Sequence, residues 1–150
     1  MNGKLIKKYF SVKHHHHKKH VAIILSGCGY ADGSEIQETS AIIFNLSKLN
    51  IMWTAYSFDM NQTHVINHNN HQETLDQTRN MLNESSRITR TKVENLNNLH
   101  FENYQGVVLP GGFGAAKNLS NFAFENENFT VNEILDKKLR EFHKVIFFYL

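Results

Sequence analysis

Short apolar runs alternate along the chain with longer segments whose apolar residues recur every three or four positions. The runs HVAIILSG (20–27), IMWTAYSF (51–58) and GVVL (106–109) are brief and nearly continuous, as expected for strands buried on both faces of a parallel sheet. A fourth strand-like run, VIFFYL, occupies 145–150. Because helical patterns separate these runs, the sequence predicts an α/β sandwich with a mainly parallel sheet.

Three segments between the strands have the spacing of amphipathic helices. Ser34 and Gln37 form the capping-box pattern S-x-x-Q, which predicts the start of a helix with an apolar stripe of Ile42, Leu46 and Leu49. A second helix is expected around 76–86. Thr130 and Glu133 form another capping box, and the helix expected there has one apolar face: Val131, Ile134, Leu135, Leu139 and Phe142.

Two glycine-rich loops, GCGYADG (27–33) and LPGGFGAAKNLS (109–120), follow predicted strands. Sites in parallel sheets collect in such loops. The first loop has glycine spacing one residue longer than the dinucleotide fingerprint, and Asp32 and Glu35 place negative charge where a pyrophosphate would bind. The second lacks the G-K-[ST] of a phosphate-binding loop. The spacing therefore disfavours nucleotide binding.

The candidate chemistry leaves several alternatives open. Gly111 and Gly112 either direct amides at a developing negative oxygen or form a turn that needs positive φ. Glu35 either favours the helix dipole as a first-turn acid or acts as an acid or base in a pocket. Cys28, the only cysteine, is either a reactive thiol or a small apolar residue, and no activating cation is readable beside it.

Composition and charge narrow the class of protein. The chain has 150 residues, 41% of them hydrophobic, which suits one domain with a core. Residues 1–31 hold six lysines and no acid, so the remaining 119 residues carry a net charge of −4 and no basic footprint for nucleic acid. No run of 18 apolar residues predicts a membrane span. A single cysteine fits a reducing compartment.

Residues 1–19 form a basic extension, and 20–150 are expected to hold the folded domain. The extension has the composition of either an organelle-targeting peptide or a disordered tail, so cytoplasmic and mitochondrial or other organellar locations are both open. Four consecutive histidines at 14–17 allow weak metal binding, but a partial tag or a homopolymer slip accounts for them as well.

Four segments together resemble a known family: ILSGCGYADGSEIQE, HVINH, TRNMLNESSRITR and VVLPGGFGAAKNLSNFA. They are similar to the ElbB branch of the PfpI superfamily, glutamine-amidotransferase-like proteins also called enhancing lycopene biosynthesis or glyoxalase-like proteins, from about His20 to about His143. The resemblance implies a flavodoxin-like α/β sandwich. It also implies a site in which a cysteine on a strand-to-helix turn is paired with a glutamate, here Glu35, beside oxyanion-binding amides, here Gly111 and Gly112.

The same resemblance implies an activity: conversion of 2-oxoaldehydes to 2-hydroxy acids, with a small carbonyl compound as substrate and neither cofactor nor metal. Glu35 would shuttle a proton through a hemithioacetal stage. A non-catalytic binding or chaperone-like domain is the alternative. A homodimer is expected by analogy alone, and neither a nucleic-acid nor a membrane partner is expected.

The chain departs from the family pattern near its end. The family's nucleophilic cysteine follows the next strand, after the helix that ends near His143, whereas this chain stops at Leu150 with no second cysteine. Cys28 lies in the first loop and does not replace it. We therefore expect a partial domain, incomplete at its C-terminus and inactive by itself. The residues at 145–150 are interpreted either as intron read-through or as a genuine strand.

Overall fold

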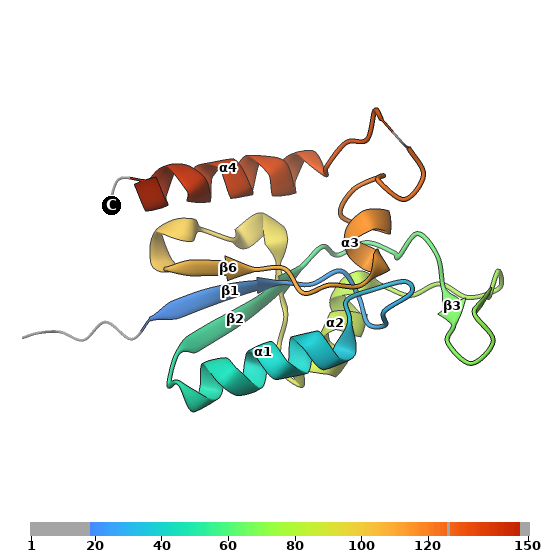
Figure 1. Ribbon diagram of the computed structural model, residues 1–150, viewed down its shortest axis with the longest axis horizontal. Coiled ribbons are helices and arrows are strands. Elements are labelled where there is room, and N and C mark those ends of the chain that lie inside the picture. Colours follow the sequence, from blue (N-terminus) through green and yellow to red (C-terminus); the bar gives the residue numbers. More distant parts are fainter. Residues whose placement is uncertain (1–18, 126, 148–150) are drawn as a thin grey trace, which may run out of the picture.

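The computed structural model describes residues 19–125 and 127–147, which form three layers (Figure 1). Predictions for residues 1–18, including the targeting extension and the histidine run, lie outside the described residues. The central sheet has four parallel strands: β1 (His20–Ile24), β2 (Met52–Ser57), β5 (Glu94–Asn95) and β6 (Gly106–Val108). One face is covered by α4 (Glu133–Phe147), and the other by α1 (Ile36–Lys48) and α2 (Met81–Thr89). The predicted α/β sandwich is thus confirmed.

The strand order β5-β2-β1-β6 fixes where a site can form. The chain passes from β1 to β2 to β5 in one direction and then returns to place β6 on the free side of β1. In register, Ile23 of β1 lies beside Ala55 of β2 and Val108 of β6. Because the order reverses at β1, the loops after β1 and β6 lead to helices on opposite faces of the sheet, and such a switch point at the carboxyl end is where ligands bind in parallel sheets. Both glycine-rich loops begin there.

The core lies on both faces of the sheet because residues of β1 alternate between them. Ala22 and Ile24 belong to the cluster beneath α4, together with the helix residues Leu135 and Phe142. Ile23 and Leu25 belong to the cluster on the opposite face, against the stripe predicted for α1, which includes Ile42 and Leu46. Every residue from Ala22 to Leu25 is at most 1% exposed, as predicted for a doubly covered strand.

The first helix begins one residue later than its capping box predicted. The N-cap of α1 is Glu35, whose carboxylate accepts the N–H of Glu38 at 2.6 Å. Ser34, the predicted cap, is buried instead, and its Oγ accepts the N–H of Ser26 at 2.9 Å. The serine hydroxyl is therefore used to close the loop, and the next acceptor side chain caps the helix.

The second helix also starts later than predicted. α2 begins at Met81, and the Asn80 side chain caps it by accepting the N–H of Asn83 at 3.0 Å. Residues 74–79 are held as a loop, because the N–H of Thr74 donates to the carbonyl of Val65 and the carbonyl of Arg79 accepts the N–H of Gln62. These pairings take the place of the helical hydrogen bonds that a helix beginning near Asp76 would form.

The last helix, α4, differs from the sequence prediction at both ends. Asn132 caps it by accepting the N–H of Ile134 at 3.0 Å, so Thr130 is not the cap, and Val131 forms a bridge with Ser120 instead of joining the helix face. The helix then continues through Phe147, so the strand predicted at 145–150 is wrong as far as Phe147. A short apolar run cannot be distinguished from a buried helical turn by periodicity, and an existing helix extends easily.

A small hairpin, not predicted from the sequence, lies beyond the carboxyl end of the sheet (Figure 1). Its strands are β3 (Ile66–Asn67) and β4 (Gln72–Glu73), paired antiparallel. It is built from the asparagine- and histidine-rich segment after β2. Within the described residues, no helix has the length and apolar character that crossing a membrane requires.

A buried pair of tyrosines beneath α4 gives a prediction for alkaline pH. The hydroxyls of Tyr56 and Tyr104 are hydrogen-bonded at 2.6 Å, and burial, followed by this bond, raises the pKa of Tyr56 well above its ordinary value. The folded chain therefore retains a proton that the unfolded chain loses near pH 10, and stability should fall as pH rises above about 10. In Tyr56→Phe, the urea midpoints at pH 9 and pH 11 should differ less than they do in wild type. A fall in midpoint from pH 9 to pH 11 that is equal in the two proteins would contradict this.

Candidate active site

The two glycine-rich loops are joined by backbone hydrogen bonds at the carboxyl ends of β1 and β6. Three bonds of 2.7, 2.7 and 2.9 Å make the connection: Glu35 N–H to Gly111 O, Phe113 N–H to Tyr30 O, and Gly114 N–H to Gly33 O. The second loop then enters the short helix α3 (Phe113–Lys117). The segments predicted to form the site are therefore one rigid unit, although about 75 residues separate them in sequence.

Gly112 is required by this close approach. Its φ is +107°, and a Cβ at this position would lie 2.4 Å from the carbonyl oxygen of Gly33 and 2.6 Å from the nitrogen of Glu35. The prediction of a turn with positive φ is thus confirmed for Gly112. Gly111 does not have positive φ. The role of either amide in stabilising an oxyanion stays a prediction.

The amide of Gly111 contacts a carboxylate that was not predicted from the sequence, that of Glu38. Its N–H donates to Oε2 of Glu38 at 2.6 Å, a short hydrogen bond to an ionised acceptor. Glu38 lies one turn after Glu35 in α1, and its two oxygens approach the Gly111 backbone from the exposed side. The i, i+3 spacing of the two glutamates is the signal that could have drawn attention to it.

Glu35 itself is half-buried and has a structural role. Its carboxylate caps α1 at the N–H of Glu38, so the helix-terminus interpretation is confirmed. The same side chain also lines a hollow of about 400 Å³, and the acid–base role stays a prediction. The other residues lining it are Tyr30, Gly112, Phe113, Ala115 and Ala116. The fold thus brings Glu35 and Gly112 to one hollow, with Gly111 as the adjoining residue.

Asp32 does not crowd the start of α1, contrary to expectation. It is fully buried, and its Oδ2 accepts the N–H of Ile66 at 2.7 Å. Its Oδ1 lies 3.8 Å from Nε2 of His68. This carboxylate therefore anchors the β3–β4 hairpin to the first glycine loop, and only Glu35 and Glu38 add negative charge at the helix terminus.

Cys28 is half-buried in the first loop and has the properties of an unreactive thiol. Burial raises its pKa, and the nearby carboxylate of Glu84 adds to this effect. Because the thiolate is the reactive form, iodoacetamide should modify Cys28 at pH 7.5 at least about tenfold more slowly than it modifies a cysteine in a short peptide. Unfolding in urea should abolish the difference, and a rate equal to that of the peptide in the folded chain would contradict the expected protection.

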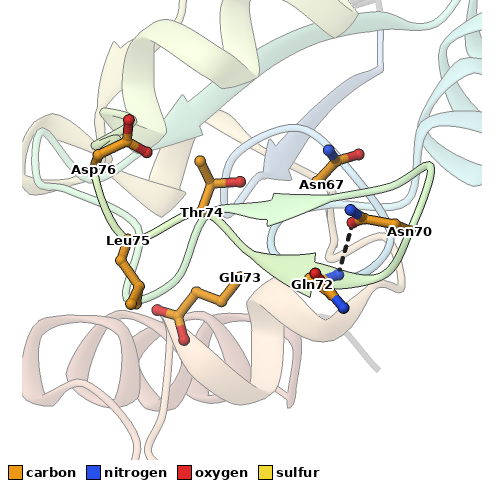
Figure 2. A pocket seen from close by; sticks show the side chains of 7 residues that line it. All are labelled: Asn67, Asn70, Gln72, Glu73, Thr74, Leu75 and Asp76. Atoms are coloured by element: carbon orange, nitrogen blue, oxygen red, sulfur yellow. Dashed lines mark hydrogen bonds between the residues drawn. The ribbon is translucent and has the colours of Figure 1, made fainter.

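A second hollow, of about 390 Å³, opens along the β3–β4 hairpin (Figure 2). Its lining is almost wholly polar: Asn67, Asn70, Gln72, Glu73, Thr74, Leu75 and Asp76. Asn70 closes the turn by accepting the N–H of Gln72 at 3.0 Å. None of the predicted site residues lies in this hollow. In residues 19–125 and 127–147, no group of three or more histidine, cysteine or acidic side chains is arranged to hold a metal ion.

Known proteins resemble the chain over most of its length. No protein-family model matches it. The human (Homo sapiens) glutamine amidotransferase-like class 1 domain-containing protein 3, mitochondrial, is 45% identical over 124 residues, which make up 83% of this chain and 46% of the human protein. The rat (Rattus norvegicus) ES1 protein homolog, mitochondrial, is 45% identical over 82% of this chain and 46% of its own length. The chain therefore spans about half the length of the curated relatives it matches.

A solved structure has the same arrangement of elements. The crystal structure of an isoprenoid biosynthesis protein with an amidotransferase-like domain from Ehrlichia chaffeensis superposes with a TM-score of 0.79 at 34% identity, covering 84% of this chain and 59% of that one. The fold is therefore an amidotransferase-like α/β structure of the flavodoxin-like type. The homologues of this chain are glutamine amidotransferase-like class 1 domain proteins, among them the ES1 homologues.

Proposed function

We propose that this chain supplies the carboxylate and oxyanion-binding part of an ElbB-like, glyoxalase-type site that converts 2-oxoaldehydes to 2-hydroxy acids without a cofactor. The observation that carries the proposal is the hydrogen bond of 2.6 Å between the Gly111 N–H and the Glu38 carboxylate, directly beside Glu35. An amide that already binds a carboxylate oxygen has the polarity that a developing oxyanion needs. We infer two candidate proton-transfer residues, Glu35 from the sequence and Glu38 from the geometry.

The reaction would proceed in steps that balance. A cysteine thiolate adds to the aldehyde carbon, and the resulting hemithioacetal holds its oxygen near the Gly111 amide. A carboxylate removes the proton from that carbon and returns a proton to the neighbouring carbon, giving a thioester of the 2-hydroxy acid. Water then hydrolyses the thioester and restores the thiol. Since Cys28 is the only thiol in this chain and lies in the first loop, the chain alone should not complete the first step.

The two glutamates can be tested as a matched pair. Two proteins are assayed in parallel with methylglyoxal as substrate and lactate as the measured product: the 150-residue chain, and a full-length product in which these residues are continued by the remaining part of a curated relative. We expect turnover in the full-length product, a loss of at least about 100-fold in one of the variants Glu35→Gln and Glu38→Gln, and a smaller effect in the other. Turnover by full-length protein that is unchanged in both variants would remove these carboxylates from the mechanism.

A non-catalytic binding domain is the second candidate, and one observation favours it. The Gly111 N–H already donates to the Glu38 carboxylate, and the Glu35 carboxylate already accepts the Glu38 N–H, so the amide proposed for an oxyanion is occupied by a side chain of the protein itself. A full-length product that binds small carbonyl compounds but releases no hydroxy acid would support this alternative.

We also propose a mitochondrial location. Support comes from the names of the human and rat relatives, both given as mitochondrial, and from the six lysines and absence of acids in residues 1–31. A fusion of residues 1–31 to a fluorescent protein should enter mitochondria, and a diffuse cytoplasmic signal would contradict the proposal.

A further inference from the structure

We infer that the hollow beside Glu35 binds the side chain of the carbonyl substrate and selects apolar, flat substituents, with Tyr30 and Phe113 as the specificity-determining residues. The inference rests on the proposed function and names the substrate class more narrowly. Glu35 is the only charged residue among the six that line the hollow. The remaining lining is two aromatic rings, two alanines and one glycine.

The size of the hollow fits such a substituent. It measures about 400 Å³, within the range of small-ligand sites. A closed apolar cavity of about 150 Å³ is enough for benzene. Ala115 and Ala116 contribute only methyl groups, which leaves this space open. A hydroxylated substituent would lose hydrogen bonds to water there and find only Glu35 and the Tyr30 hydroxyl, which already bonds His71, to replace them.

Both aromatic rings are held in place from outside the hollow. The hydroxyl of Tyr30 is hydrogen-bonded to Nδ1 of His71 at 2.8 Å, and its ring meets the ring of His68 edge-on with centroids 5.0 Å apart. The Nζ of Lys117 lies 5.7 Å from the centre of the Phe113 ring, and it donates to the carbonyl of Ala31 at 3.0 Å. Side chains fixed before binding lose little conformational freedom when a ligand arrives.

The two rings are also connected through the backbone. The N–H of Phe113 donates to the carbonyl of Tyr30 at 2.7 Å, which sets the position of one residue relative to the other. Tyr30 and Phe113 are nevertheless 41% and 57% exposed. Exposed aromatic rings around a hollow beside a carboxylate form a binding surface for a flat apolar group.

The test measures binding, so that it does not depend on turnover. Three neutral probes share a hydroxyketone head and differ only in substituent: 2-hydroxyacetophenone, hydroxyacetone and dihydroxyacetone. Each is titrated into the ¹⁵N-labelled chain, and dissociation constants are obtained from the amide shifts of residues 112–116. We expect the phenyl probe to bind at least about tenfold more tightly than dihydroxyacetone, with the methyl probe between them.

Two variants and a matched control locate the selectivity. Phe113→Ala should reduce the preference for the phenyl probe to less than about twofold, and Ala116→Leu should do the same by filling the hollow. Phe122→Ala is the control, because Phe122 is 56% exposed, like Phe113, but does not line the hollow. Dispersed amide spectra verify folding in each case.

Any of three results would overturn the inference: equal affinity for the three probes, no binding of any probe, or an equal effect of Phe113→Ala and Phe122→Ala on the affinities. Selective binding by a full-length product that produces no hydroxy acid would leave this inference intact and contradict only the proposed catalysis.

Discussion

Replacing Gly112 with alanine is expected to lower the free energy of unfolding by at least about 3 kcal/mol. The alanine would have to keep a φ of +107°, and its methyl carbon would lie 2.4 Å from the Gly33 carbonyl oxygen. The obstacle is backbone on the facing loop, which cannot move aside without breaking the bonds between the loops. Urea denaturation followed by circular dichroism measures the loss.

Gly106→Ala is the matched control for this variant. Gly106 lies in β6, six residues before Gly112, and a Cβ there would make only an ordinary contact of 3.4 Å with Val21. We expect a change within about 0.5 kcal/mol, because no strained backbone angle is involved. If the two alanine variants proved equally stable, the close approach of the glycine loops would be wrong.

The second large effect is expected for Asn118, whose side-chain amide joins three loops. Asn118 is 7% exposed. Its Nδ2 donates to the carbonyls of Ser26 and Asp32 at 2.9 and 2.8 Å, and its Oδ1 accepts the N–H of Thr63 at 2.9 Å. Asn118→Ala would leave these three backbone groups without partners. A loss of about 3 kcal/mol or more is expected, because the carbonyls of Ser26 and Asp32 belong to buried residues and each orphaned buried group costs about 1–3 kcal/mol, while the N–H of the exposed Thr63 adds less.

Asn118→Asp separates hydrogen bonding from volume. The aspartate fills the same space and can still accept from Thr63, but as a carboxylate it cannot donate to the two carbonyls. We expect it to be destabilised about as much as the alanine variant. Asn45→Ala is the control, because Asn45 is exposed on α1 and only donates to the carbonyl of Ala41 at 2.8 Å. Similar urea midpoints for Asn118→Ala and Asn45→Ala would refute the role of Asn118.

Strands were predictable from sequence because their pattern records burial directly. β1 is apolar at every position from Val21 onward because helices cover both faces of the sheet (Figure 1). A strand covered in this way needs apolar side chains on both faces, whichever segments of the chain cover it. The meeting of the two glycine-rich loops could be predicted with the strands, since both loops begin at the carboxyl ends of parallel strands. The fourth parallel strand, β5, comprises just Glu94–Asn95, which is too short and polar to produce a pattern.

Helix ends and the second glutamate could not be predicted in the same way. Ser34 is a good cap by type, but Ser26 uses its hydroxyl, and this competition exists only in the folded chain. The contact of Glu38 with Gly111 spans 73 residues, so the local sequence around Glu38 contains no trace of it. Predictions failed wherever a polar side chain had two possible partners and the tertiary structure chose between them.

The strand order has a consequence for synthesis of the chain on the ribosome. β1 and β2 flank α1 in sequence and can pair early. The other neighbour of β1 is β6, which is synthesised 85 residues later, as the hydrogen bond from the His20 N–H to the side chain of Gln105, just before β6, indicates. At translation rates of about 5–20 residues per second, that interval lasts about 4–17 s. During this time one edge of β1 exposes its unpaired backbone to other nascent chains, and this is the period in which the protein most needs a chaperone.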